Sequence, residues 1–561
     1  MKLSFPHTVF AGIALQLATV VCAQQQAYED YHDNGQVRTK GQYERGVEHG
    51  TWTFFYDTGI PEEESNYYYG QLHGSVRTFY PSGRPMTEGY FHYGRQDSIM
   101  RHFAESGRVL EEGYYLDGSR TGIWNYFYEK GDTLMVEEYR DTVMYLWTFN
   151  GKDKESQVIN GNGYRTDRNE KGAVIRRVQY AEGLKDGEYQ ENFSEGKPKE
   201  TGRYIRGLKH GMWTTYYANG NIKEKAMYNE GIPDGVHEEY DQLGQPIVVG
   251  SFAAGKKNGY WTWYLDTGKK DMEGLFENDK QTGPWIYWYG NGNKHYFGEF
   301  VNGLMEGTWT WQYFGGQKWK AGTYKNGQKN GLWTTWFENG KKLQEGNYAN
   351  GLEEGEWHSW YENGAQQEIG NYHLGHMSGK WMGWHPNGVK HYEGAWAITK
   401  KTNKLGALED RYRPVDDMTF TRSTEGEIKT GTWKYWSEKG IPESITTYNS
   451  TGLMHGPSET YNVNGRLITK GNYSNGKPSG KWQYFHEHGA PMRTCTYKEG
   501  KLNGPSVTYD QQGRLIEESN YRNNRLHGDY KKYDERNGKL IYHSQYENGK
   551  EVKSIMGKPG Q

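Results

Sequence analysis

A period of about 24 residues runs along nearly the whole chain and constrains its fold more than any single motif. The clearest copy runs from Gly331 to Gly355, GLWTTWFENGKKLQEGNYANGLEEG, and its last glycine opens the next copy. Counted from the opening glycine, the repeat carries tryptophan at position 3, aromatic residues at positions 6 and 7, glycine at 10 and 16, tyrosine at 18 and glycine at 21. Because about twenty such units fill the chain, its length counts repeats rather than globular domains.

Asn-Gly at positions 9 and 10 marks a tight turn in many copies, for example at Asn339 and Gly340. Both residues of a two-residue type I′ loop need positive φ, which asparagine tolerates and glycine adopts freely, so each unit is predicted to be a β-hairpin. The sequence thus predicts an all-β solenoid of about twenty stacked hairpins of about 24 residues, which form an elongated, twisted, single-layer antiparallel sheet.

Two stretches interrupt the period. Insertions in solenoids map to loops on one face, which is often the binding face, and the alternative is a surface loop that the fold merely tolerates. The predicted regions are a signal peptide at 1–23, N-terminal repeats at 24–146, an irregular insertion at 147–162, central repeats at 163–402, an insertion loop at 403–430, C-terminal repeats at 431–552 and a tail at 553–561.

A two-residue loop fixes which positions face one another across the hairpin. Position 7 then pairs with position 12, Trp333 lies opposite Gly346 and Tyr348 lies opposite Gly331, so that each ring covers the backbone of a cross-strand glycine. Stacking of hairpins buries the position-3 rings, for which ligand contact is the alternative role. The predicted packing residues are Trp261, Trp285, Trp309, Trp333, Trp357, Trp381, Gly346 and Tyr348.

The aromatic residue at position 6 points to the opposite, more polar face of the predicted sheet. A single-layer sheet offers little there to cover these rings, and regularly spaced exposed aromatics mark surfaces that bind proteins or stack on sugar rings. The alternative is that neighbouring rings cover one another. The candidate binding residues are Tyr264, Trp288, Trp336, Trp360 and Trp384.

The first residues have the pattern of a secretory leader, with an apolar run from Val9 to Val21 and a small-residue cleavage site ending at Ala23. We expect cleavage there and an exported protein that is periplasmic, on the outer surface or secreted, with lipid anchoring through Cys22 as the alternative. Cys495 is then the remaining thiol, so stability has to come from packing between repeats rather than from a disulfide. Because it stands where glycine 16 is expected, we interpret it as a structural substitution.

Composition and motifs argue against catalysis. Lys+Arg 67 against Asp+Glu 70 gives a formal charge of −3, which supplies no broad basic field for nucleic acid or anionic lipid. Several histidines fall just before opening glycines and lack the spacing of a metal site. No serine, cysteine and histidine grouping resembles a nucleophile motif. We therefore predict no catalytic residue, no metal site and no cofactor.

The glycines and aromatic residues of GLWTTWFENGKKLQEGNYANG and GEWHSWYENGAQQEIGNYHLG resemble the MORN repeat family, specifically the variant hairpin repeat of bacterial exported proteins that is often described as antitoxin-like. The resemblance covers essentially the whole chain after the leader. It implies a non-catalytic scaffold that binds proteins or sometimes lipids. We expect an exported scaffold that binds a protein or an envelope component. The alternatives are a glycan-binding protein that uses the position-6 aromatics and a lipid-surface binder; neither nucleic-acid binding nor membrane insertion is expected.

Overall fold

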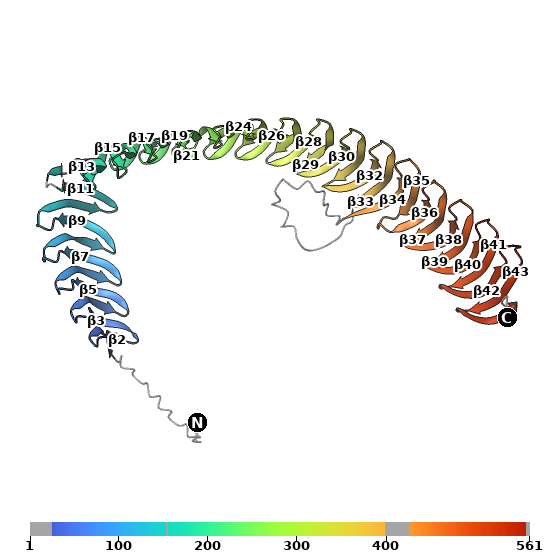
Figure 1. Ribbon diagram of the computed structural model, residues 1–561, viewed down its shortest axis with the longest axis horizontal. Helices are drawn as coiled ribbons and strands as arrows, with labels where there is room; N and C mark the ends of the chain where they lie inside the picture. The colour runs from blue at the N-terminus through green and yellow to red at the C-terminus, as the bar shows by residue number, and fades with distance from the viewer. Residues whose placement is uncertain (1–24, 153–154, 399–425, 557–561) are drawn as a thin grey trace, which may run out of the picture. The chain divides into compact units, whose positions relative to one another are not determined.

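The structure, a computed structural model, describes residues 25–152, 155–398 and 426–556. In these ranges the chain forms 44 strands of one antiparallel sheet and no helix, and successive strands make hairpins (Figure 1). The predicted all-β array of stacked hairpins is therefore confirmed. No membrane-crossing helix occurs among the described residues. The chain divides into two compact units, residues 1–256 and 257–561.

The strands of the first unit, with β21 at its boundary, are β1 (Gln25–Tyr31), β2 (Val37–Glu44), β3 (Val47–Phe55), β4 (Pro61–Tyr68), β5 (Gln71–Phe79), β6 (Pro85–His92), β7 (Arg95–Phe103), β8 (Val109–Leu116), β9 (Ser119–Phe127), β10 (Thr133–Arg140), β11 (Val143–Asn150), β12 (Ser156–Ile159), β13 (Asn162–Arg168), β14 (Val174–Ala181), β15 (Leu184–Asn192), β16 (Pro198–Ile205), β17 (Leu208–Tyr216), β18 (Ile222–Asn229), β19 (Ile232–Tyr240), β20 (Pro246–Ala253) and β21 (Lys256–Lys257).

The strands of the second unit are β22 (Gly259–Tyr264), β23 (Lys270–Glu277), β24 (Lys280–Trp288), β25 (Lys294–Val301), β26 (Leu304–Gln312), β27 (Lys318–Lys325), β28 (Gln328–Trp336), β29 (Lys342–Ala349), β30 (Leu352–Trp360), β31 (Gln366–His373), β32 (His376–Trp384), β33 (Lys390–Ile398), β34 (Glu427–Trp436), β35 (Pro442–Tyr448), β36 (Met454–Tyr461), β37 (Leu467–Ser474), β38 (Lys477–Phe485), β39 (Pro491–Lys498), β40 (Lys501–Tyr509), β41 (Leu515–Arg522), β42 (Arg525–Tyr533), β43 (Leu540–Glu547) and β44 (Lys550–Met556).

The turn within a repeat differs from the predicted type I′ loop. In the β28–β29 hairpin, the Gly340 N–H donates to the Phe337 carbonyl (2.9 Å) and the Phe337 N–H donates to the Lys341 carbonyl (2.8 Å). Gly340 has a φ of 83°, whereas Asn339 does not have a positive φ. The loop therefore holds three residues, with glycine in the left-handed conformation.

The three-residue loop changes the register beside the turn. Position 6 pairs with position 12, as Trp336 does with Lys342, so the predicted pairing of positions 7 and 12 is wrong. A β-bulge then restores the register, because Trp333 pairs with Gly346 and Gly331 with Tyr348 as predicted.

The two-residue loop with two positive φ values lies at the other end of the repeat, between one hairpin and the next. Asn350 (φ 51°) and Gly351 (φ 85°) join β29 to β30, and the flanking residues Ala349 and Leu352 pair. This is the turn in which the tolerance of asparagine and glycine for positive φ is needed.

Asparagine at position 9 instead joins neighbouring hairpins. The Asn291 side chain accepts a hydrogen bond from the Asn293 N–H (2.9 Å) and donates to the Phe314 carbonyl of the next repeat (2.7 Å). The same side-chain donation to the next repeat recurs at Asn34, Asn219, Asn339, Asn363 and Asn387. The turns are thus linked from repeat to repeat by side-chain hydrogen bonds.

Replacing Asn291 by aspartate tests this link, because aspartate keeps the acceptor and removes the donor. We expect a local loss of about 1 to 2 kcal/mol, since the Phe314 carbonyl keeps only the Asn293 side chain (3.0 Å) as its side-chain donor and faces a carboxylate. Amide hydrogen exchange in the turns of β24–β25 and β26–β27 measures the loss. The control is Asn339→Asp, which should affect its own turns and leave these unchanged.

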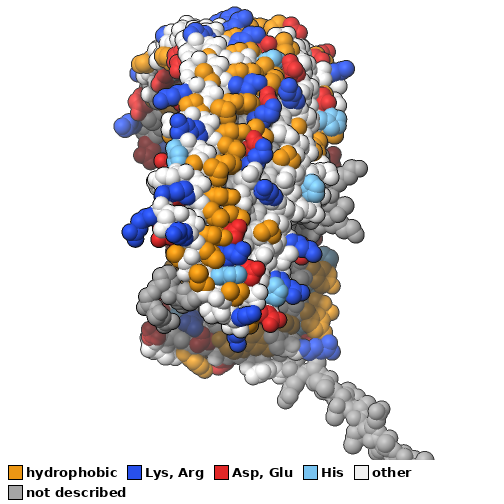
Figure 2. Space-filling view, turned by 90° about the vertical axis from the view of Figure 1, so that its right-hand side faces the viewer, with side chains coloured by type: hydrophobic (Ala, Val, Ile, Leu, Met, Phe, Trp, Pro, Cys, Tyr) orange, Lys and Arg blue, Asp and Glu red, His pale blue; other side chains and the backbone are white. Residues whose placement is uncertain are grey.

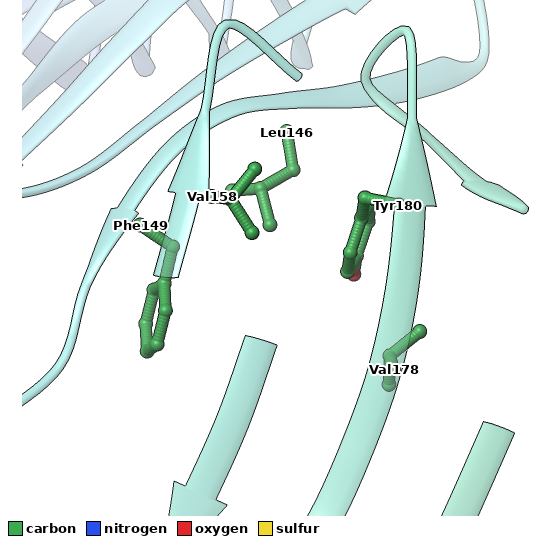
Figure 3. Close-up of a cluster of buried hydrophobic side chains, with 5 residues drawn as sticks. All are labelled: Leu146, Phe149, Val158, Val178 and Tyr180. Carbon is green, nitrogen blue, oxygen red and sulfur yellow. The ribbon is translucent and has the colours of Figure 1, made fainter. Parts of the chain in front are cut away.

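The first predicted insertion is a shortened repeat rather than an irregular loop. Residues 147–162 contain the end of β11, all of β12 and the start of β13, and β11 pairs with β12. The Gly161 N–H donates to the Trp147 carbonyl (2.9 Å). A buried cluster with no tryptophan fills this region (Figure 3); its members are Leu146, Phe149, Val158, Val178 and Tyr180.

The second interruption lies mostly outside the described residues, as does the predicted leader. Its flanking strands pair directly, with Ile398 opposite Glu427. β34 begins at Glu427, so residues 427–430, which were expected in the loop, are part of a strand. β44 runs to Met556 and likewise extends into the stretch predicted as a tail. In both places, strand pairing extends beyond the boundary that the repeat pattern predicted.

Candidate binding surface

The position-3 tryptophans form the core between hairpins. The six that were predicted to pack are 0% to 8% exposed. Each pairs with a glycine of its own hairpin. Trp333 lies between Gly346 of its own hairpin and Gly322 of the preceding one. The ring covers Gly322, where a β-carbon would overlap the indole, and Gly346 is covered in turn by Trp357. The predicted cover of Gly346 by Trp333 is therefore wrong, because the ring leans toward the preceding hairpin.

Hydrogen bonds and edge-to-face contacts fix these rings. The Trp333 indole N–H donates to the Thr323 carbonyl of the preceding hairpin (3.1 Å). Tyr348 meets Trp333 and Trp357 edge to face, at 5.9 Å and 5.2 Å between ring centres. Edge-to-face contacts of this kind hold each hairpin to its neighbours. On the surface seen in Figure 2, hydrophobic side chains gather in a stripe flanked by charged ones.

The predicted position-6 track is half-buried: Tyr264, Trp288, Trp336, Trp360 and Trp384 all have intermediate exposure. Lysines from the preceding hairpin lie over three of these rings. The Nζ-to-centre distances are 5.6 Å for Lys270 over Trp288, 5.8 Å for Lys318 over Trp336 and 5.6 Å for Lys342 over Trp360. The array thus covers part of the track with its own cations.

Exposed aromatic side chains gather in the N-terminal repeats. Only Tyr260 and Phe314 lie outside them among the exposed aromatic residues that the structure describes. The N-terminal members are Tyr28, Tyr31, Tyr68, Tyr69, Tyr90, Tyr93 and Tyr114. The aromatic surface available to a partner therefore lies in a different part of the chain from the predicted track.

Six of the N-terminal rings form one continuous group at the turns between repeats, which we call the rim cluster; its members are His49, Tyr68, Tyr69, His73, His92 and Tyr93. Tyr68 contacts Tyr69 at 4.6 Å and Tyr93 at 6.1 Å between ring centres. His73 lies 4.7 Å from Tyr93 and 5.1 Å from His92. Tyr68, Tyr69 and Tyr93 are 41%, 42% and 53% exposed.

Two tyrosines of the rim cluster have a strained backbone. Tyr69 (φ 47°) and Tyr93 (φ 46°) occupy the first loop position of the type I′ turn, where other repeats place asparagine at Asn302, Asn326 and Asn350. A left-handed conformation costs a bulky residue about 1 to 2 kcal/mol. The same conformation occurs at this loop position with other residues, such as Arg206 (φ 48°), Glu230 (φ 48°) and Leu374 (φ 50°), so it belongs to the turn and does not by itself indicate a function.

The repeat pattern alone does not predict the rim cluster, because position 20 belongs to the turn between hairpins. The segments NYYYG (66–70) and FHYG (91–94) place tyrosine where the repeat favours asparagine. That departure from the repeat was the available signal. The residue pattern does not predict how the rings are arranged, since their contacts depend on how the hairpins stack.

Two histidines of the rim cluster contact a carboxylate and a backbone amide. The His49 Nε2 atom lies 3.3 Å from a Glu44 carboxylate oxygen, and the His73 Nδ1 atom accepts a long hydrogen bond from the Tyr93 N–H (3.4 Å). In ranges 25–152, 155–398 and 426–556, no group of three or more histidine, cysteine, aspartate or glutamate residues could hold a metal ion.

These features define a β-hairpin repeat protein. Three segments, 48–67, 209–230 and 329–350, match the family model described as MORN repeat variant. The resemblance noted from the sequence is confirmed at these three positions, and the chain carries MORN-variant repeats. No curated protein matches it.

Among solved structures, the chain is similar to the crystal structure of TcdB2–TccC3, with 10% identity over 94% of this chain and 34% of that chain and a TM-score of 0.12. It is also similar to a Tc holotoxin pore of Photorhabdus luminescens, with 10% identity over 96% of this chain and 32% of that chain and a TM-score of 0.12. The chain spans about a third of the length of these chains. At such TM-scores the likeness carries no functional argument.

Proposed function

We propose that the protein is an exported, non-catalytic repeat scaffold that binds a protein partner through the rim cluster. The observation that carries this proposal is the cluster itself, in which three exposed tyrosines lie in continuous contact with histidine rings. Tyrosine offers a large, rigid and amphipathic contact area and is enriched at protein interfaces.

Ring orientation favours a protein over a glycan. Stacking on a sugar needs an open ring face, but Tyr68 meets Tyr69 and Tyr93 edge to face, with interplanar angles of 74° and 68°. The cluster therefore presents ring edges and hydroxyl groups beside exposed ring surface. That mixture suits the hydrogen-bonding and apolar groups of a polypeptide.

The test replaces the two strained tyrosines by the residue that other repeats use, Tyr69→Asn with Tyr93→Asn. We expect this variant to be at least as stable as wild type, because asparagine tolerates the left-handed conformation. We also expect recovery of the partner to fall at least tenfold. The measurement is quantitative cross-linking and pull-down from an envelope extract, followed by affinity measurement with the purified partner.

The matched control is Tyr260→Ser, which removes an exposed tyrosine (51%) elsewhere and should leave partner recovery unchanged. If the double variant recovers as much partner as wild type, the rim cluster is not the binding site. If no protein is captured but retention on cell-wall polysaccharide is lost in the double variant, the glycan-binding alternative is correct.

A further inference from the structure

In many repeats a side-chain hydrogen bond holds the turn that leads to the next hairpin. The residue just before the opening glycine accepts from the N–H of the first loop residue of that turn. Asp234 accepts from the Ala254 N–H (3.2 Å) and Glu354 from the Leu374 N–H (2.9 Å). The same bond is formed by the carboxylates of Asp97, Asp186 and Glu306. It thus holds the loop residue that has to adopt a positive φ.

In the rim cluster the acceptor of this bond is a histidine. The His73 Nδ1 atom accepts from the N–H of Tyr93, whose φ is 46°. A ring nitrogen accepts a hydrogen bond only while it carries no proton, so protonated His73 would direct a donor at the Tyr93 N–H. Histidine changes its charge between about pH 5 and 8, a range in which an ordinary carboxylate keeps its acceptor. The turn of Tyr93 is therefore held by a bond that acid can remove.

A second histidine lies beside the first. The ring centre of His92 is 5.1 Å from that of His73, and each of the two is 4.7 Å from the ring centre of Tyr93. Two charged imidazole rings at this separation repel each other. Charging both rings therefore favours an arrangement in which they separate, and Tyr93 lies in contact with both.

Protonated His73 has no carboxylate partner that would offset the lost bond. In the part of the chain that the structure describes, no ion pair includes His73, whereas the His49 Nε2 atom lies 3.3 Å from a Glu44 oxygen. Arg95 stands opposite His92 and is paired with Asp117 (2.7 Å). The titratable and charged side chains at this end of the neighbouring strands and turns are Glu48, His49, Tyr68, Tyr69, His92, Tyr93, Arg95, Asp97 and Asp117.

We propose that the rim cluster is closed at neutral pH and opens on acidification, with His73 as the titrating acceptor and His92 as its charged neighbour. The bond to the Tyr93 N–H exists while His73 is neutral, so it holds the turn above the titration range of histidine and is lost as the pH falls through that range. The consequence for binding rests on the proposed function: a partner held by the three tyrosines is released at about pH 5 to 6.

The test is amide hydrogen exchange of the full chain at about pH 7.5 and about pH 5.5, corrected for the intrinsic pH dependence of exchange. We expect protection of the Tyr93 turn to fall at least fivefold at the lower pH. His73→Asn should abolish this response, because asparagine is an acceptor that does not titrate, as Asn503 is for the Asn523 N–H (3.4 Å). His92→Asn should reduce the response at least twofold, since it removes the second charge.

The matched control is His455→Asn. His455 accepts from the Asn475 N–H (3.3 Å) outside the rim cluster, so this change should leave the response of the Tyr93 turn as in wild type. Exchange in β5 and β6 at neutral pH checks that each variant is folded.

The inference is overturned if the wild-type Tyr93 turn is equally protected at both pH values, or if His73→Asn or His92→Asn keeps the full response. It is also overturned if the turn of Ala254, held by the Asp234 carboxylate, loses as much protection as that of Tyr93. All of these measurements use the chain alone, so they do not depend on whether the rim cluster binds a protein. Failure to recover a partner at neutral pH would contradict the proposed function and leave the exchange results standing.

Discussion

Replacing Gly346 by alanine is expected to destabilise the array locally by about 3 kcal/mol, at the upper end of the cost of overpacking a core. A β-carbon at this position would overlap the Trp357 indole, which lies on the bare backbone of Gly346. The ring is held in place by its own N–H, which donates to the Asn347 carbonyl (3.2 Å), and has little room to move away. Neighbouring hairpins would therefore have to separate.

Hydrogen exchange in β29 and β30 is the appropriate measurement, because repeat arrays open locally and a single unfolding midpoint averages over many repeats. The control is Cys495→Ala, at the same repeat position, where the next hairpin presents Ser506 instead of tryptophan. We expect a change below about 1 kcal/mol there. A second variant, Gly346→Ala with Trp357→Ser, should lose less than the sum of the single changes. Additive losses would contradict the steric explanation.

The same steric rule explains residue choice along the chain. Where the next hairpin carries a position-3 tryptophan, position 16 is glycine, as at Gly322 before Trp333. Position 16 has a side chain in several units whose next hairpin carries another residue at position 3, although Gly89 faces Met100. Examples of such facing pairs are Ser65 with Val76, Ala226 with His237, Cys495 with Ser506 and Ser519 with Tyr530. Cys495 is thus accommodated because no indole needs its space, and burial raises the pKa of its thiol.

The hairpin array, the pairing of Trp333 with Gly346 and the burial of the position-3 rings followed from the repeat pattern. The turn type did not, because each repeat contains two turns of similar composition, Asn339-Gly340 and Asn350-Gly351. Residue preference alone does not tell which turn needs two positive φ values. Contacts between hairpins decide it, since Asn339 is held by a hydrogen bond to the next repeat.

The candidate site was harder to predict than the fold. Lysines of the preceding hairpin cover the position-6 rings. Whether a lysine lies over a ring depends on how neighbouring hairpins are shifted relative to one another, and the sequence of a single repeat does not show this shift. The rim cluster depends on Tyr69 and Tyr93 adopting a conformation that their residue type disfavours. The repeat pattern predicts the role of a residue that is common at its position. It does not predict the role of a residue that differs from the one common at that position.

A comparison of Trp285→Ala with Trp288→Ala tests the division of the repeat into a packing face and a partly open face. Both residues lie on β24, but Trp285 is 1% exposed and its indole N–H donates to the Leu275 carbonyl (3.0 Å). Removing it leaves a large cavity and takes a hydrogen-bond donor from the Leu275 carbonyl. We expect a local loss of about 3 to 5 kcal/mol, as for other buried tryptophans.

Trp288 is half-buried and covered on one side by Lys270, so Trp288→Ala should cost only about 1 to 2 kcal/mol. Hydrogen exchange and limited proteolysis of β23 to β25 measure both variants under the same conditions, so each serves as the control for the other. Because the two changes remove the same side chain from the same strand, the difference between them reports burial rather than chemistry. Equal losses would mean that the position-6 rings are part of the core, which would leave the exposed tyrosines of the N-terminal repeats as the principal aromatic surface for a partner.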